Sequence, residues 1–255
     1  MWFVIIIMAL LILVVVWCVL SFSVHKNNEM LRPLLTESDD RTRSIVILTC
    51  TVSPHKGILT LLMKNREERL HVYLVSIRRW LDETGLTVVV VDNSGYPFPE
   101  LEQERERHKE RFEILSFEEK DLPTADFLDG QASKGTHEMM AIHYAILRSR
   151  FRNEALFWIK VTGRYFIPDL ESLLVTKNMN RYYALRQLNP FRCEVVGAHH
   201  TVAHYVFFPY LYTHDTEGVF RKRISRFPPG RVLRCPRLPV PPTLSGGFKM
   251  RVTSL

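Results

Sequence analysis

The sequence lacks several patterns that mark well-defined protein classes. It has four cysteines, with no Cys-x-x-Cys pair and no histidines at zinc-finger spacing, which argues against a structural zinc site. Cys193 and Cys235 can form a disulfide if the domain folds in an oxidising compartment. No internal repeat is present. With 46% hydrophobic and 24% charged residues, the bulk of the chain is predicted to be globular rather than disordered.

Charge is absent from the first 22 residues, MWFVIIIMALLILVVVWCVLSF. About 20 apolar residues in a helix span the hydrocarbon core of a bilayer. A cleaved signal peptide normally has a basic start and about 7–15 apolar residues, so the pattern favours an uncleaved anchor over a signal peptide. The nearest basic residues, Lys26 and Arg32, follow the anchor, and the positive-inside rule read strictly then favours a cytosolic body. With so few charges to count, the charge pattern alone leaves the topology open.

Acidic residues are absent after Glu217, whereas the same tail contains nine lysines and arginines. The whole chain has a net charge of +7, so the part up to Glu217 is close to neutral. A basic tail attracts phosphates, anionic lipid or nucleic acid, and a merely solvated tail is the plain alternative. Aromatic residues are not interleaved through it as stacking platforms, which argues against nucleic acid.

Hydrophobic periodicity predicts an α/β domain. Residues 23–43 are polar and are interpreted as a stem between the anchor and a domain over 44–255. Strands are predicted at 44–52, 86–95, 113–117, 155–162, 182–188 and 193–208; helices at 55–81, 99–113, 137–151, 169–176 and 215–227; a loop at 121–135; and irregular structure over the last 28 residues. Apolar strands alternating with helices indicate a mostly parallel central sheet flanked by helices.

Polar residues gather where the predicted parallel strands end, which is where ligands bind in such sheets. Asp92 can accept hydrogen bonds from a nucleotide base or ribose, although Asn-Ser-Gly after it also favours a plain turn. Gly163 permits close backbone approach, and the planar guanidinium of Arg164 suits a diphosphate or a carboxylate partner. The candidates at the strand ends are Thr51, Asp92, Asn93, Ser94, Thr162, Gly163 and Arg164.

A second group of candidates opens the helix predicted from residue 137. Thr136 is a plausible N-cap, and the free backbone N–H groups of a helix start suit a phosphate. Lys134 and Gly135 stand beside it, and Lys134 would add a positive charge. Glu138 lies in the first turn, where a carboxylate also stabilises a helix without any functional role.

Taken together, these segments resemble the GT-A family of sugar-nucleotide glycosyltransferases, in particular a divergent glycosyltransferase-like group found in eukaryotes, bacteria and large viruses. The resemblance covers roughly residues 44–250. Its motifs are VVVVDNSG, KGTHEMMAIHYAI, FWIKVTGRYFI, HDTEGVFRKRI and LSGGFKM. It implies a nucleotide-sugar donor (UDP-, GDP- or CMP-sugar) and a glycan, glycoprotein or glycolipid acceptor.

The chain departs from ordinary GT-A enzymes in having no DxD motif after FWIKVTGRYF, where carboxylates would hold Mn²⁺ or Mg²⁺. Asp126 and Asp129 have the wrong spacing and position. The resemblance therefore favours transfer without a metal, with Arg164, Lys160 or the basic tail neutralising the leaving diphosphate, although use of Mn²⁺ or Mg²⁺ stays open.

An inverting transferase also needs a general base. Glu217 matches the late acidic residue of the group, and His214 and Asp215 are alternatives beside it. A capped helix start explains the same residues without catalysis.

The layout of anchor, short stem and α/β domain resembles type II enzymes of the Golgi or ER with a lumenal catalytic domain. Two other readings remain: a catalytically inactive, membrane-tethered binding or scaffold protein, and a cytosol-facing protein whose basic tail docks on anionic lipid.

Overall fold

The computed structural model describes residues 43–54, 63, 65–129, 133–210, 215–244 and 251–255. The predicted anchor and all but the last residue of the predicted stem lie outside these ranges. In the part of the chain that is described, no helix is both long and apolar enough to cross a membrane.

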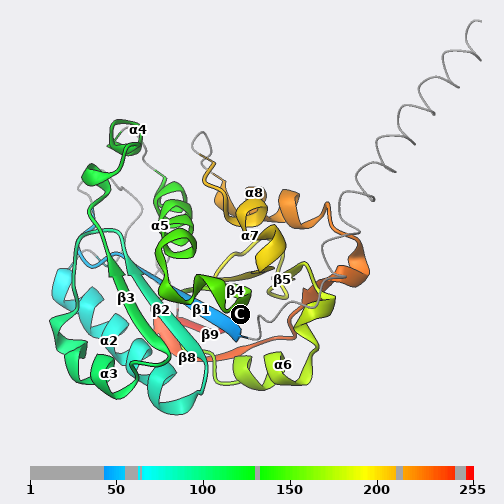
Figure 1. Ribbon diagram of the computed structural model, residues 1–255, viewed down its shortest axis with the longest axis horizontal. Coiled ribbons are helices and arrows are strands. Elements are labelled where there is room, and N and C mark those ends of the chain that lie inside the picture. Colours follow the sequence, from blue (N-terminus) through cyan, green and yellow to red (C-terminus); the bar gives the residue numbers. More distant parts are fainter. Residues whose placement is uncertain (1–42, 55–62, 64, 130–132, 211–214, 245–250) are drawn as a thin grey trace, which may run out of the picture. The chain divides into compact units, whose positions relative to one another are not determined.

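A seven-stranded sheet forms the centre of the fold, in the order β3-β2-β1-β4-β6-β5-β7 (Figure 1). Strands β1, β2, β3 and β4 are parallel to one another, and β6 runs antiparallel to both β4 and β5. The predicted α/β fold with a mostly parallel sheet is confirmed. The strands are β1 (Arg43–Cys50), β2 (Thr87–Asp92), β3 (Phe112–Ser116), β4 (Ala155–Thr162), β5 (Ala184–Arg186), β6 (Val195–His199) and β7 (Val232–Arg234).

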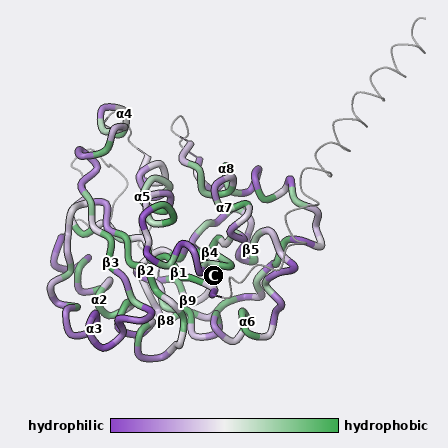
Figure 2. The backbone as a smooth tube through the Cα atoms, viewed as in Figure 1, coloured by the Kyte–Doolittle hydropathy of each residue, from purple (hydrophilic) through white to green (hydrophobic). Residues whose placement is uncertain are grey.

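The central strands are buried on both faces because their side chains are apolar almost throughout. Every residue of β2 is buried, and so is every residue of β4 except Thr162 at its end. Figure 2 shows this contrast between hydrophobic central strands and the hydrophilic α3 (Glu102–Arg107) at the surface. The apolar runs that predicted β1, β2 and β4 are therefore confirmed as buried strands.

Helices cover both faces of the sheet (Figure 1). On one side lie α5 (Lys134–Arg148), α7 (His200–Phe207) and α8 (Thr216–Ile224); on the other lie α2 (Arg66–Glu83) and α6 (Leu170–Thr176), together with a separate hairpin of β8 (Pro239–Leu244) and β9 (Arg251–Ser254). Helix α2 begins after Asn65, whose side chain accepts hydrogen bonds from the N–H groups of Glu67 and Glu68.

Several predicted boundaries are wrong. Helix α5 begins at Lys134, so Ser133 occupies its cap position and Thr136, predicted as the N-cap, lies inside the first turn. The predicted strand at 193–208 divides into β6 and α7, because the His199 side chain accepts from the N–H of Thr201 and starts a helix. The predicted loop at 121–135 contains α4 (Ala125–Asp129).

The predicted irregular tail is also wrong in part, since it contains β7, β8 and β9. Prolines at 239, 241 and 242 argue against a strand in the sequence, because proline has no N–H to donate to a sheet. Among the described residues β8 pairs with β9 alone, and such an edge position tolerates proline. Cys193 and Cys235, for which the sequence leaves a disulfide open, are both free and buried in the structure.

Candidate functional site

The order of the strands reverses between β1 and β4. The chain builds β1, β2 and β3 outward in one direction and then returns through α5 to place β4 on the other side of β1. In open α/β sheets, ligands bind at the carboxyl ends of the strands beside such a reversal. Here Thr49 pairs with Thr162, and Cys50 with Asp92, so the ends of β1, β2 and β4 meet as the sequence predicts.

The Glu138 carboxylate stands at this reversal. Its Oε1 accepts from the hydroxyl of Thr49 at 2.7 Å and from the hydroxyl of Thr162 at 3.4 Å, and it pairs with Lys160 Nζ at 2.9 Å. Among the described residues, Oε2 has neither a hydrogen bond nor an ion pair, and the side chain is 22% exposed. One oxygen is therefore fixed, and the other is open to a ligand.

The Lys160 ammonium is completely buried on the same face of the sheet. It donates to the carbonyl oxygen of Cys193 at 2.6 Å and to the hydroxyl of Thr162 at 3.1 Å. Burial, the largest single cause, lowers the pKa of Lys160, but Glu138 together with Cys193 and Glu194 more than offsets it, so the pKa lies above its ordinary value. Lys160 thus stays charged, with Glu138 as its counter-ion, rather than facing a ligand.

Asp92 joins the loop after β1 to the loop after β2. Its Oδ2 accepts from the N–H of Val52 at 2.8 Å, and its Oδ1 accepts from the N–H groups of Ser94 at 2.8 Å and Tyr96 at 3.1 Å. Burial raises the pKa of Asp92 despite these hydrogen bonds. Both carboxylate oxygens already accept hydrogen bonds from backbone N–H groups, so Asp92 holds the loops after β1 and β2 in place.

Asn93 extends this connection to α5. The Thr51 hydroxyl donates to Asn93 Oδ1 at 2.6 Å, and Asn93 Nδ2 donates to Glu119 Oε1 at 2.5 Å. Glu119 Oε2 in turn contacts His137 Nδ1 at 2.6 Å, and Glu119 and His137 are both buried. Sequence reasoning missed Glu119 and His137, because no motif spacing links a short turn after β3 to a helix.

Gly163 is required by close packing where β4 ends. Its N–H donates to the carbonyl oxygen of Thr49 at 2.9 Å. A Cβ at this position would lie 2.6 Å from Cys50 Sγ and 2.7 Å from that same carbonyl oxygen. Gly163 therefore serves the packing of β4 against the end of β1, and its predicted place in a ligand site stays a prediction.

We expect Gly163→Ala to destabilise the fold by about 1–3 kcal/mol, because the added methyl group has no space beside β1. Urea denaturation of the full-length chain measures the effect. Gly230→Ala is the matched control, since a Cβ there meets nothing within 4 Å, and we expect no loss of stability. Equal midpoints for the two variants would contradict the packing argument.

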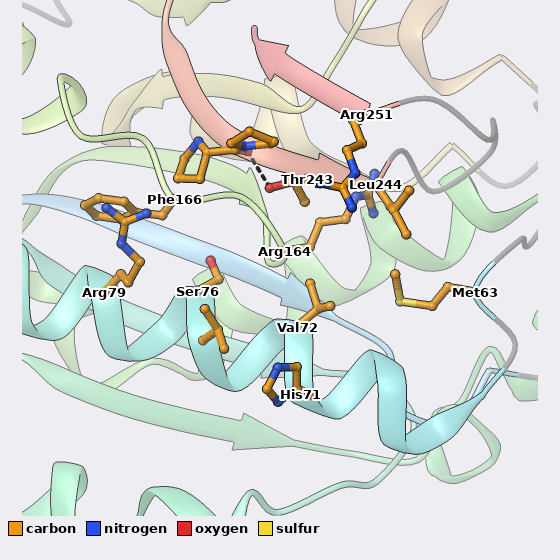
Figure 3. Close-up of a pocket in the computed structure, with 13 residues that line it drawn as sticks. Met63, His71, Val72, Ser76, Arg79, Arg164, Phe166, Thr243, Leu244 and Arg251 are labelled. Atoms are coloured by element: carbon orange, nitrogen blue, oxygen red, sulfur yellow. Dashed lines mark hydrogen bonds between the residues drawn. The ribbon is translucent and has the colours of Figure 1, made fainter.

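Arg164 follows Gly163 but turns toward α2, away from the Glu138 face. Its guanidinium lies over the Tyr165 ring, 4.7 Å from the centroid, and lines a pocket formed with α2 and the β8–β9 hairpin (Figure 3). Its predicted role at a diphosphate is not tested by this placement and stays a prediction.

The start of α8 packs against the start of α5. A Cβ on Gly135 would lie 1.8 Å from Thr216 Oγ1, so only glycine fits there. Asp215 caps α8 by accepting from the N–H of Gly218 at 2.8 Å, and Glu217 in the first turn is exposed. His214 lies outside the described residues.

Burial, the largest cause, raises the pKa of the Cys193 thiol; Lys160 lowers it, and the charges of Glu138 and Glu217 raise it further. The close approach of Gly135 to Thr216 places Glu217, the next residue of α8, near the start of α5. No hydrogen bond or ion pair among the described residues joins Glu217 to Glu138 or Lys160.

No group of three or more His, Cys, Asp or Glu side chains among the described residues is arranged to hold a metal ion. The residues that end β4, Thr162, Gly163 and Arg164, bring no carboxylate. The use of Mn²⁺ or Mg²⁺ stays open.

No family model and no curated protein sequence matches this chain. Similar solved structures include a protein from Desulfovibrio desulfuricans G20 assigned to the nucleotide-diphospho-sugar transferases, 14% identical, with a TM-score of 0.44 over 76% of this chain and 79% of that one. A cytidylyltransferase from Leptospira borgpetersenii serovar Hardjo-bovis is 9% identical, with a TM-score of 0.42 over 84% and 82% of the two chains.

The galactosyltransferase LgtC, in complex with donor and acceptor sugar analogues, is 8% identical, with a TM-score of 0.38 over 75% and 73% of the two chains. Because all three TM-scores lie below 0.5, these likenesses alone say nothing about what this chain does.

Proposed function

We propose that this protein is a glycosyltransferase that moves a sugar from a nucleotide-sugar donor to an acceptor hydroxyl. The observation that carries the proposal is the Glu138 carboxylate at the β1–β4 reversal, with Oε1 fixed by Thr49 and Lys160 and Oε2 open. A carboxylate oxygen held in this way accepts a hydrogen bond from a sugar or ribose hydroxyl. The resemblance of the segments around Asp92, Glu138 and Gly163 to nucleotide-sugar transferases supports the same reading.

The start of α5 is the proposed site for the donor phosphates. The Ser133 side chain makes no capping hydrogen bond, and the N–H of Thr136 donates to the Ser133 carbonyl oxygen at 3.1 Å. Backbone N–H groups and the helix dipole favour an anion there, and the exposed Lys134 adds a positive charge. Arg164 lies on the α2 side, so the cationic role in this proposal falls to Lys134.

Glu217 is the proposed general base for an inverting transfer. It would take the proton of the acceptor hydroxyl while the acceptor oxygen attacks the anomeric carbon and the bond from that carbon to the phosphate oxygen breaks. Glu217 is exposed at the start of α8, which packs against the start of α5. Asp215, the alternative base, already accepts the N–H of Gly218.

The acceptor class and the location of the protein are carried over from the sequence. The acceptor in this proposal is a glycan or glycoconjugate. Residues 1–22 would anchor the chain, with the catalytic domain in the lumen of the Golgi or ER. These points rest on the apolar run and on the layout resemblance alone.

Donor binding is the direct test. Full-length protein would be heated with UDP-, GDP- and CMP-sugars, each with Mn²⁺ and with EDTA. A donor at about 100 times its Kd adds about 2.7 kcal/mol of stability. We expect one nucleotide class to stabilise the protein, and we expect Lys134→Gln to weaken that effect.

Lys109→Gln is the matched control, because Lys109 is an exposed lysine just before the start of β3, whereas the site lies at the carboxyl ends of the strands. Stabilisation in EDTA would mean that no metal is needed, whereas stabilisation only with Mn²⁺ would keep the activity and reject the metal-free account. A folded protein that no donor stabilises would overturn the proposal in favour of an inactive scaffold.

A further inference from the structure

A groove of about 300 Å³ lies between α2 and the β8–β9 hairpin, on the face of the sheet opposite Glu138 (Figure 3). Val72 and Val75 of α2 and Leu244 of β8 supply its apolar lining, whereas the Phe166 ring is 3% exposed and lies under the Arg79 guanidinium, 4.3 Å from the ring centroid. Val75 is 47% exposed and Leu244 41% exposed, so both present apolar surface to the groove. This size matches the small end of small-molecule sites.

The groove is strongly positive. Arg79, Arg164, Arg251 and His71 line it, and no aspartate or glutamate does. Arg79 is neutralised by a salt bridge to Glu83, whereas neither Arg164 nor Arg251 pairs with an acid among the described residues. Two unpaired guanidinium groups in one apolar pocket repel each other unless an anion lies between them.

Arg164 also has an unsatisfied donor. Its Nε is buried and has no hydrogen-bond partner among the described residues. In Figure 3 the Arg164 and Arg251 side chains point toward one another from opposite sides of the groove, next to Leu244. A buried donor without an acceptor is costly, and a bound anion removes that cost. Guanidinium groups bind phosphate oxygens with paired hydrogen bonds.

We propose that this groove binds a phosphate monoester that carries an aliphatic or aromatic group. The phosphate lies between Arg164 and Arg251, and the apolar group lies against Val72, Val75 and Leu244. The site is separate from the Glu138 cluster, and it stands whether or not the protein transfers sugars. The ester can come from a lipid phosphate or from a soluble aromatic phosphate.

Calorimetric titration of the full-length chain in phosphatidylcholine nanodiscs tests this site. The probes are hexyl phosphate, which represents a lipid phosphate, and 1-naphthyl phosphate, which represents a soluble aromatic one. The controls are inorganic phosphate, which lacks the apolar group, and 1-naphthol, which lacks the phosphate. We expect at least one ester to bind at least tenfold more tightly than both of these, and the tighter ester identifies the source.

Variants separate the site from general charge attraction. We expect Arg164→Gln, Arg251→Gln and the blocking change Val75→Trp each to weaken binding of the ester at least tenfold. Val75 and Arg251 are exposed, so these two variants keep the test valid if Arg164→Gln does not fold. Arg226→Gln, another exposed arginine, is the control and should bind as the parent does.

Three results would each overturn the proposal: no binding of either ester, inorganic phosphate binding as tightly as the esters, or affinities unchanged in both Arg251→Gln and Val75→Trp. Loss of donor binding at the Glu138 site would not affect these titrations. Failure of the proposed function is therefore distinguishable from failure of the proposed phosphate-ester site.

Discussion

Replacing Glu217 with glutamine is expected to lower kcat for sugar transfer by about 10²–10⁴-fold, the usual contribution of a general base. Glutamine keeps the shape of the side chain but cannot take a proton from the acceptor. Donor affinity should not change, because in the proposal the donor binds at α5. The measurement is the rate of product formation at saturating donor, alongside donor titration of the same preparation.

Glu217 is exposed, so its replacement should leave the free energy of unfolding within about 0.5 kcal/mol of the parent. The control is Glu106→Gln, which changes an exposed carboxylate on α3. If Glu217→Gln transfers sugar as fast as Glu106→Gln, Glu217 is not the base.

Replacing Glu138 with glutamine is expected to destabilise the fold by about 3 kcal/mol, because removing one partner of a buried ion pair leaves the other charge without a counter-ion. That charge is the fully buried Lys160 ammonium, whose other contacts are neutral oxygens. Urea denaturation of the full-length chain measures the loss. The same replacement also removes the open carboxylate oxygen, so donor binding should fall with it.

A second change tests the cause of this loss. Lys160→Met removes the buried charge, so the double variant Glu138→Gln, Lys160→Met should be more stable than the sum of the two single effects predicts, by up to about 3 kcal/mol. Strictly additive effects would mean that Glu138 and Lys160 do not stabilise each other. Glu106→Gln again serves as the carboxylate control.

The sequence predicts the central strands of this fold well, because their apolar runs fit a strand that is buried on both faces. Strand β4 begins and ends where ALFWIKVT does, since a run of apolar residues that reaches Thr162 can only lie inside a sheet covered on both faces. The meeting of Thr49, Asp92 and Thr162 follows from parallel pairing alone.

The errors occur where local signals compete. Lys134 puts a positive charge at the positive end of the helix dipole, and Gly135 has a low helix propensity, so the sequence favours a later start of α5 than the structure has. Residues 200–207 combine β-branched and aromatic side chains that favour strands, and one cap at His199 overrides them. The roles of Asp92 and Lys160 could not be predicted, because whether a charge meets solvent or a buried partner depends on segments distant in sequence.

The hydrogen bonds that run from Thr51 through Asn93 and Glu119 to His137 have a consequence for recognition. They tie the ends of two strands to the first turn of α5, so these three segments hold their shape before anything binds. A ligand that enters there has little backbone to order, and less of its binding free energy is lost to conformational entropy. Selectivity at such a surface comes from shape, because a ligand that fits poorly would have to break these hydrogen bonds to be accommodated.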